Sequence, residues 1–398
     1  MMTPSKKTYG LLAASFVSIF LLTSCGEFFV PNNGGGSGSS CSSCVYIANS
    51  GTDDIAQFAV TNPLTVVAST NVAVSDVPSS IAVSPAGPYV YVGTVNSGIF
   101  LFAIQSGGSL GTVQPGSSSV GPYAMTVSPD GEWLYTASLD VNGSCTTTGV
   151  GAGASGYPYQ VAAFQIGSSG ALGTPIVVNL PDACGSTLTP PTSLVVSADG
   201  GYLFMSAGLY GFAGLTFDES TTELTVRSGL SSVVTPGAIS YNGVAVDPSS
   251  KYVFVATSGT GGSLTQYSIN NTNGVYSLGT VSTQKPIDSL YAVTAPASGS
   301  YVYVTDRTSG KIYGYSYGKT SLAAISGSPF APTTASNGTI AMVSDSASKY
   351  ILTINTTTGP NLQQFSIGST GALTATSTGT TSSGSWAPVA LAVTGSGS

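Results

Sequence analysis

A short apolar strand, a turn and a second strand rich in Tyr or Val recur seven times along this chain. The first strand of the unit reads SSIAVSP at residues 79–85 and NGVAVDP at 242–248. The second reads YVYV at 89–92 and YVFV at 252–255. Because one such unit can bury its apolar faces only against its neighbours, the repeat constrains the architecture of the whole chain.

The spacing of the second strands is typical of propeller blades. Tyr89 and Trp133 are 44 residues apart, and Tyr252, Tyr301 and Tyr350 follow one another at intervals of 49. A period of about 40–50 residues with four strand-like runs indicates a β-propeller. In one unit, four strands are expected at 81–84, 89–93, 98–104 and 110–113. The sequence therefore predicts an all-β, seven-bladed propeller of four-stranded antiparallel blades.

The two ends of the repeat region complement each other. The first recognisable strand, 45–48, has the character of a second strand without an inner strand before it. The last one, 389–393, has the character of an inner strand with nothing after it. We therefore expect the C-terminal strand to complete the N-terminal blade, which would close the ring and leave no exposed edge.

The blade that begins near Trp133 contains an insertion, because the next second strand, at Tyr202, follows only after 69 residues. The extra residues, about 140–159, are rich in Gly, Ser and Thr. They form either a tolerated surface loop or a loop that contacts a ligand or partner. Cys145 lies in the insertion and Cys184 in the following blade-to-blade connection. Both segments open on one face of a propeller, so we predict a disulfide between these two cysteines.

The N-terminus has the features of an export signal. Two lysines, Lys6 and Lys7, precede an apolar run that ends in Leu-Thr-Ser-Cys25. This ending resembles the bacterial lipobox, which implies a signal peptide at 1–24 and lipid on Cys25; an ordinary signal peptide with an incidental cysteine is the alternative. Residues 25–44 would be the tether and 45–398 the propeller. In the family pattern, Gly26 implies the outer membrane or cell surface rather than the inner membrane.

Cys41 and Cys44 lie in the tether, separated by two serines. In an exported protein we expect a local disulfide here. A redox pair is the alternative, but no strand-to-helix turn is present to lower a thiol pKa. The further ligands that a zinc site needs are missing, so no metal is predicted.

The composition excludes several functions. Only 6% of the residues are charged, histidine is absent and the net charge is −7. Such a chain cannot make the phosphate contacts of a nucleic-acid-binding protein. Without histidine it has no Ser-His-Asp or Cys-His nucleophile system. No phosphate-cradling loop and no calcium loop of the EF-hand type occur, so no cofactor is predicted.

The repeat units resemble YVTN-type propellers and, more closely, the lactonase-like seven-bladed family that includes 6-phosphogluconolactonases. The resemblance is carried by turns such as SPDG at 128–131 and by hairpins such as FQIGSSGALGTP at 164–175. It implies the propeller fold and suggests a sugar-lactone hydrolase. The histidine expected in that family is absent, and Arg227 and Arg307 are the only arginines. No catalytic residue of the family can therefore be assigned.

One group of charges nevertheless suggests a binding site. Lys285 and Asp288 lie in a blade-to-blade connection, and Arg307 and Lys311 lie in the next loop between second and third strands. Both loops open on the same face. The group would suit an anion or a sugar acid, with Arg307 as the carboxylate binder and Asp288 as an acid or base. Solvated loop charges that form weak pairs are the alternative.

Tyr123 and Asn242 precede inner strands and are therefore candidates for the central funnel, where they would bind a carbohydrate or peptide. For Tyr123, packing between blades is the alternative. We expect a monomeric, membrane-tethered propeller that binds a carbohydrate, a sugar acid or an envelope protein without catalysis. A lactonase that uses Asp288, Arg307 and Lys285, and a structural or adhesion protein of the cell envelope, are the alternatives.

Overall fold

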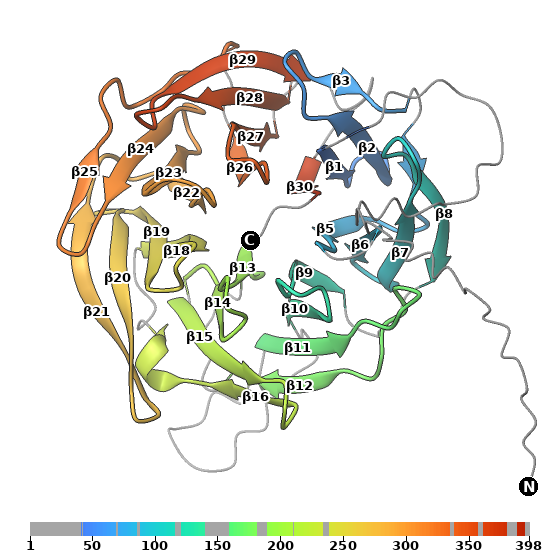
Figure 1. Ribbon diagram of the computed structural model, residues 1–398, viewed down its shortest axis with the longest axis horizontal. Helices are drawn as coiled ribbons and strands as arrows, with labels where there is room; N and C mark the ends of the chain where they lie inside the picture. The colour runs from blue at the N-terminus through green and yellow to red at the C-terminus, as the bar shows by residue number, and fades with distance from the viewer. Residues whose placement is uncertain are drawn as a thin grey trace, which may run out of the picture. The chain divides into compact units, whose positions relative to one another are not determined.

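The chain divides into two units, Met1–Gly35 and Gly36–Ser398, and every residue described here belongs to the second. The computed structural model describes residues 41, 43–68, 71–85, 88–115, 121–139, 159–180, 189–209, 211–233, 239–334, 338–356, 361–379 and 388–394. Their strands form seven antiparallel sheets arranged around a common centre (Figure 1). The predicted seven-bladed β-propeller is confirmed.

Each blade runs from an inner strand at the centre to an outer strand at the rim. The inner strands, from blade 1 to blade 7, are β30 (Pro388–Val393), β5 (Pro78–Val83), β9 (Pro122–Val127), β13 (Ser193–Val196), β18 (Ile239–Val246), β22 (Leu290–Thr294) and β26 (Thr339–Ser344). The second strands are β1 (Cys44–Asn49), β6 (Tyr89–Thr94), β10 (Trp133–Leu139), β14 (Tyr202–Ser206), β19 (Tyr252–Gly259), β23 (Tyr301–Asp306) and β27 (Tyr350–Asn355).

The outer half of each blade is a hairpin. The third strands are β2 (Asp54–Ala59), β7 (Gly98–Ile104), β11 (Tyr159–Gln165), β15 (Gly211–Asp218), β20 (Leu264–Thr272), β24 (Ile312–Tyr317) and β28 (Leu362–Ile367). The outer strands are β3 (Thr65–Val66), β8 (Leu110–Pro115), β12 (Ile176–Asn179), β16 (Glu223–Val226), β21 (Val275–Gln284), β25 (Leu322–Ala324) and β29 (Leu373–Gly379). Two short strands, β4 (Val72–Ala73) and β17 (Ser232–Val233), pair with β2 and β15, and a single 3₁₀ turn, η1 (Ser228–Leu230), follows β16 in the described chain.

The ring closes through β30, as predicted. Val45 pairs with Val393 and Ile47 with Leu391, so the last strand becomes the inner strand of the blade that holds β1. In Figure 1 the red end of the chain therefore lies in the blue blade. The Cys44 amide donates a 2.9 Å hydrogen bond to the Thr394 hydroxyl at the end of this ladder. Closure satisfies backbone groups of β1 that would otherwise form an open edge.

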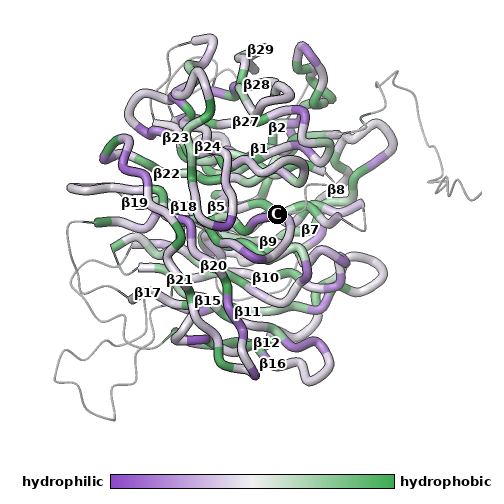
Figure 2. Tube along the Cα trace, turned by 60° about the vertical axis from the view of Figure 1, so that its left-hand side comes forward, coloured by the Kyte–Doolittle hydropathy of each residue, from purple (hydrophilic) through white to green (hydrophobic). Residues whose placement is uncertain are grey.

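The core lies between the blades rather than in one central mass. The buried apolar residues form seven clusters, each shared by two neighbouring blades. Tyr91 and Leu101 of blade 2 meet Leu134 and Phe164 of blade 3, for example. Each large side chain buried in this way contributes about 1.5–3 kcal/mol. Figure 2 shows that the hydrophobic segments run through the strands, whereas hydrophilic segments gather at the turns.

The strand order defines two faces. The connection face carries the blade-to-blade connections and the loops between second and third strands, such as 285–289 and 307–311. The hairpin face carries the turns between first and second strands and between third and fourth strands, such as 128–132 and 219–222. Residues 140–158 follow β10 directly, which puts the predicted insertion between the second and third strands of blade 3. Their own structure lies outside the described residues.

Candidate functional site

The central channel is lined by the inner strands of all seven blades and has a volume of about 240 Å³. Small and β-branched side chains such as Ala82, Val83 and Val246 form its wall, and hydroxyl groups such as that of Thr126 supply its polarity. No Asp, Glu, Lys or Arg is found among the described residues that line it. The channel therefore offers no charged acid or base to a ligand.

Tyr123, predicted as a funnel residue, does line the channel. It is the second residue of β9 and so lies near the connection face. Its half-buried ring also packs against the apolar cluster between blades 3 and 4. Tyr123 therefore combines the packing role with a position from which it can contact a ligand.

Asn242, the other predicted funnel residue, is not among the described residues that line the channel; it is 5% exposed and joins two blades. Its amide nitrogen donates to the Ser258 hydroxyl at 2.7 Å and to the Leu290 carbonyl of blade 6 at 2.9 Å. Its amide oxygen accepts a 2.9 Å hydrogen bond from the Ser240 hydroxyl. Both amide hydrogens are thus already used, and a ligand would have to compete with an inter-blade contact.

The two charged loops of blade 6 lie next to each other, as predicted. The Arg307 amide donates to the Ser289 carbonyl at 2.9 Å, and the Ser289 hydroxyl donates to Oδ1 of Asp306. Asp306 is only 2% exposed. Its carboxylate also accepts bonds from the Thr308 amide at 2.9 Å and from the Ser309 hydroxyl. Asp306 is therefore a structural residue that shapes this loop.

The electrostatics of Asp306 agree with this role. Burial raises its pKa, but hydrogen bonds from Ser289, Ser309 and the amide of Thr308 outweigh burial, so the net pKa is lowered. Its carboxylate thus stays ionised because the loop solvates it. The other buried carboxylates of the described chain, Asp247 and Asp345, similarly accept backbone N–H groups in turns on the hairpin face. None of the three faces the channel.

Arg307 is exposed, and its guanidinium carbon lies 4.7 Å from the centroid of the Tyr291 ring. Tyr291 belongs to β22, the inner strand of the same blade. Burial raises the pKa of Tyr291, and the nearby guanidinium lowers it by a smaller amount. Lys285 and Lys311 are exposed in the two adjoining loops. This part of the connection face therefore presents three cations, one of them stacked on an aromatic ring.

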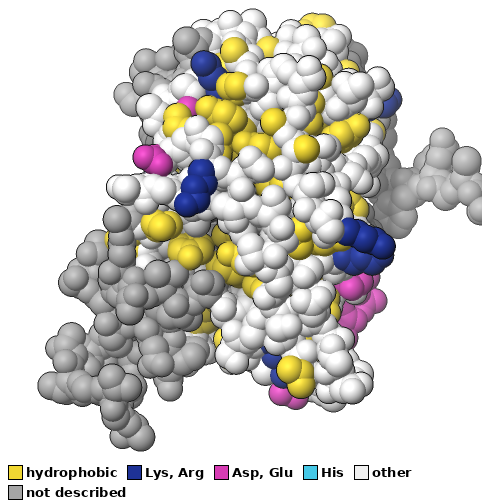
Figure 3. Space-filling view, turned by 90° about the vertical axis from the view of Figure 1, so that its left-hand side faces the viewer, with side chains coloured by type: hydrophobic (Ala, Val, Ile, Leu, Met, Phe, Trp, Pro, Cys, Tyr) yellow, Lys and Arg dark blue, Asp and Glu magenta, His cyan; other side chains and the backbone are white. Residues whose placement is uncertain are grey.

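Asp288, the predicted acid or base, is exposed beside the same loops. Its carboxylate accepts a 3.2 Å hydrogen bond from the Gly261 amide of blade 5. Neither Asp288 nor Arg307 nor Lys285 belongs to the channel lining. The charged residues thus lie on the rim of blade 6 and do not converge in the channel, as the lactonase hypothesis would require. Figure 3 shows how sparse charged side chains are on the face it presents.

A second cleft, which the sequence did not lead us to expect, lies on the hairpin face of blades 3, 4 and 5. This acidic cleft has a volume of about 760 Å³. Its polar lining includes Asp130, Asp199, Asp218, Glu219, Glu223, Arg227, Asn271, Tyr202 and Tyr276. Arg227 stacks on Tyr276 at 4.8 Å and donates a 2.8 Å hydrogen bond to Thr216. The acidic turn DEST at 218–221 was the signal in the sequence, but Asp130 of blade 3 and Asn271 and Tyr276 of blade 5 complete the cleft.

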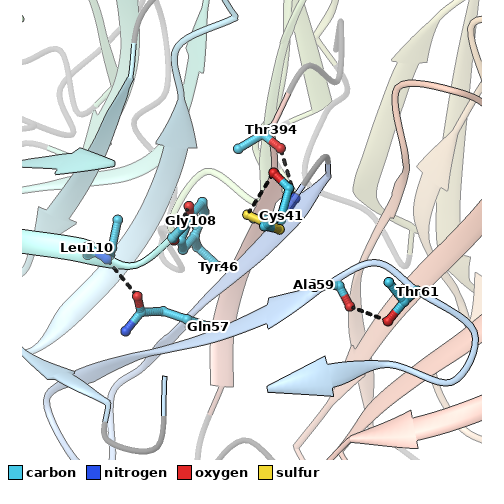
Figure 4. The surroundings of a disulfide bond; sticks show 9 residues. Cys41, Tyr46, Gln57, Ala59, Thr61, Gly108, Leu110 and Thr394 are labelled. Atoms are coloured by element: carbon cyan, nitrogen blue, oxygen red, sulfur yellow. Dashed lines mark hydrogen bonds between the residues drawn. A yellow bond between two sulfur atoms is a disulfide. The ribbon is translucent and has the colours of Figure 1, made fainter. Parts of the chain in front are cut away.

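Cys41 and Cys44 are joined by a disulfide at the start of β1 (Figure 4). A Cβ atom on Gly108, in the β7–β8 hairpin of blade 2, would lie 2.3 Å from the Cys44 sulfur. The Tyr46 hydroxyl donates a 2.7 Å hydrogen bond to the Gly108 carbonyl. The disulfide loop therefore packs against the neighbouring blade, where only a glycine leaves enough room.

Several predictions concern residues outside the described chain. These are the signal peptide at 1–24, the lipidated Cys25, most of the tether, and the disulfide between Cys145 and Cys184. In the part of the chain that the structure describes, no helix has the length and apolar character needed to cross a membrane.

Comparison with solved structures shows the same fold in several bacterial proteins. A candidate 6-phosphogluconolactonase from Bacteroides fragilis is 17% identical, with a TM-score of 0.62 over 88% of this chain and 97% of its own. The periplasmic gluconolactonase of Pseudomonas aeruginosa is 15% identical, with a TM-score of 0.62 over 83% and 94%. At such identities the likeness establishes the fold alone. No protein-family model matches this chain, and no curated protein matches its sequence.

Proposed function

We propose that this protein is a non-catalytic, ligand-binding propeller that acts outside the cytoplasm, where a lipid on Cys25 tethers it to a membrane. The observation that carries the proposal is the separation between the uncharged channel and the charged rim of blade 6. A catalytic funnel needs an acid or base at its reacting centre. A binding site needs only complementary groups on an accessible surface.

The rim of blade 6 favours a carboxylate-bearing ligand, such as a sugar acid. A guanidinium stacked on an aromatic ring keeps its N–H edges available for a planar, paired hydrogen bond to a carboxylate. Arg307 has this arrangement over Tyr291. Lys285 and Lys311 would add positive charge around it, and Tyr123 would offer an aromatic contact at the channel mouth.

Lactone hydrolysis is the second candidate function. It is favoured by the fold shared with a candidate 6-phosphogluconolactonase and with a periplasmic gluconolactonase. In that case Asp288 would activate a water molecule and Arg307 would hold the anionic part of the substrate. The exposed position of Asp288 argues against it, because a carboxylate surrounded by water is a weak base for such a step.

Parallel binding and turnover measurements distinguish the two. Binding of gluconate and 6-phosphogluconate would be followed by calorimetry, and hydrolysis of the corresponding lactones would be compared with the spontaneous rate. We expect binding without turnover, and a loss of about tenfold or more in affinity for Arg307→Ala. Lys349→Ala, which changes an exposed lysine on the hairpin face, should bind normally.

Two results would contradict the proposal. Turnover above background that disappears in Asp288→Asn would establish the lactonase instead. An absence of binding to either acid would leave the rim of blade 6 without the ligand class assigned to it, and the structural or adhesion role would then be favoured.

A further inference from the structure

A repeated hydrogen bond links neighbouring blades. A tyrosine in the second strand donates its hydroxyl hydrogen to a glycine carbonyl in the third-to-fourth-strand hairpin of the next blade. The three pairs are Tyr46 with Gly108, Tyr91 with Gly170, and Tyr303 with Gly371, at 2.7, 2.8 and 2.7 Å. Each tyrosine therefore points at the next hairpin on the hairpin face.

Tyr135 occupies the same position in β10, yet its hydroxyl group has no partner. The side chain is fully buried, and the oxygen accepts and donates no hydrogen bond. The hairpin that it faces runs from Asp218 to Glu223 in blade 4 and has no glycine. A buried hydroxyl without a partner costs free energy, so its presence needs an explanation.

Carboxylates surround this point. Asp130 and Glu132, from the β9–β10 turn of blade 3, each have an oxygen within 4.8 Å of an oxygen of Glu219 in the blade 4 hairpin. The Tyr135 ring packs edge-on against Phe217 of blade 4, with 5.6 Å between the ring centroids, and Phe217 directly precedes the turn that carries Glu219. The buried hydroxyl of Tyr135 thus lies at the boundary between the blade 3 turn and the blade 4 hairpin that carry the three carboxylates.

Nothing in the described structure neutralises these carboxylates. Of the sixteen Asp and Glu residues in the chain, five line this cleft: Asp130, Asp199, Asp218, Glu219 and Glu223. Glu132 lies beside Asp130 and Glu219. The cation in the cleft, Arg227, is held by Thr216 and by the ring of Tyr276. The arrangement therefore lacks positive charge at its centre.

We propose that Asp130, Glu132 and Glu219 bind a divalent cation, Ca²⁺ in preference to Mg²⁺, which joins blades 3 and 4. Ca²⁺ binds oxygen ligands at about 2.3–2.6 Å, so ligands on opposite sides of it lie about 4.8 Å apart. Mg²⁺ requires about 2.0–2.1 Å and a stricter octahedron. Three carboxylates leave coordination positions for water, and one such water donates a hydrogen bond to the Tyr135 oxygen.

Trp133 provides the readout for a direct test. Its ring lies 4.7 Å from the Phe217 ring at the base of the same hairpin, and it is 5% exposed. The only other tryptophan is Trp386. In the full chain with Trp386→Phe, CaCl₂ should change the Trp133 fluorescence in a saturable way. We expect one ion per chain by calorimetry, with a Kd in the range of about 10⁻⁶–10⁻³ M.

Matched variants test the assignment. Glu219→Gln should weaken Ca²⁺ binding by about tenfold or more, because it removes one of three charged ligands. Glu223→Gln, at the other end of the hairpin, should change it by less than about twofold. Tyr135→Phe keeps the packing and should weaken binding by a smaller factor, since it removes only the contact to the bound water.

The controls separate specific binding from general screening. NaCl at equal ionic strength and MgCl₂ should produce a much weaker response. An equal response to spermidine would show a site for organic cations and would overturn the assignment to a metal. A flat titration with CaCl₂ up to roughly 10 mM would also overturn it, since this exceeds the weakest affinities known for such sites. A fluorescence response to CaCl₂ that is the same in Glu219→Gln as in the unchanged protein would overturn the assignment as well.

Discussion

The hydroxyl of Tyr91 donates a 2.8 Å hydrogen bond to the carbonyl of Gly170, which lies 79 residues further along the chain and in the next blade. Both residues of this hydrogen bond occupy positions that recur in the repeat unit. Tyr91 comes from the YVYV strand, and Gly170 has the positive φ of 80° that the hairpin requires. The bond therefore adds a directional contact to the apolar cluster that joins blades 2 and 3.

Removing the hydroxyl group at this repeat position should lower the free energy of unfolding by an amount that differs between blades 2 and 3. Tyr91→Phe leaves the Gly170 carbonyl without its donor and should lower the free energy of unfolding by about 1–2 kcal/mol. Tyr135→Phe should change it by less than about 0.5 kcal/mol in buffer with a chelator, because its hydroxyl has no partner to lose. Urea denaturation of both variants tests the comparison, and equal losses would contradict it.

A second prediction concerns Gly243, where two neighbouring inner strands pack closely. A Cβ atom on Gly243 would lie 2.2 Å from the Tyr291 carbonyl oxygen of the next blade, which is backbone and cannot move aside easily. Gly243→Ala should therefore destabilise the protein by about 1–3 kcal/mol. Gly173→Ala is the matched control, since the nearest atom would be at 3.5 Å. Thermal unfolding should show a lower Tm for the first variant only.

A third prediction concerns Asp306 and the pH dependence of the free energy of unfolding. Its pKa is lowered by hydrogen bonds in the folded loop, so the carboxylate adds stability above its unfolded pKa. That stability is lost as the pH falls through the lower pKa of the folded state. Asp306→Asn replaces an acceptor oxygen by a donor and should cost about 1–3 kcal/mol at neutral pH. The difference from wild type should shrink in acid, as urea denaturation across the pH range would reveal; a constant difference would contradict this role.

The fold could be predicted from the sequence because the same pattern of strands and turns recurs at regular intervals. The regular intervals between Tyr252, Tyr301 and Tyr350 correspond to the spacing of the second strands. The strand ends were predicted less accurately. The expected inner strand at 81–84 begins at Pro78 and ends at Val83, because Pro78 pairs with Thr94 across an irregularity in the ladder. The polar residues of segment 78–80 lack the apolar character of the expected strand at 81–84, although their backbone pairs with β6.

The candidate site was harder to predict because its contacts cross between blades. The proximity of Lys285 and Arg307 followed from topology alone, and the adjoining loops do meet. The partners of Asn242 could not be foreseen, since Leu290 belongs to another repeat. For the same reason the acidic cleft escaped notice, because Asp130 and Glu219 come from turns of different blades. Repeat periodicity gives the position of each turn but not the side chains that face it across the boundary.

The closing strand supports the last prediction. Among the described inner strands, β30 alone follows the other strands of its blade in the sequence, and it pairs with β1 from Val45↔Val393 to Asn49↔Pro388. Deleting residues 388–398 would expose the edge of β1 and the apolar cluster that includes Leu352 and Val393. We expect this truncated protein to aggregate, or to unfold at a Tm lower by more than about 10 °C.

A shorter deletion, of residues 395–398 alone, provides the control, because it keeps β30 and the Thr394 hydroxyl that accepts a hydrogen bond from the Cys44 amide. Size-exclusion chromatography and thermal unfolding would compare the two. An open ring, in which blade 1 lacks only its inner strand, should elute as oligomers, since an unpaired strand edge recruits further chains. If the longer deletion remained monomeric with an unchanged Tm, ring closure through β30 would not be the source of stability assigned to it. Addition of a peptide with the sequence of residues 388–394 should then make no difference, whereas under our interpretation it should restore part of the lost Tm.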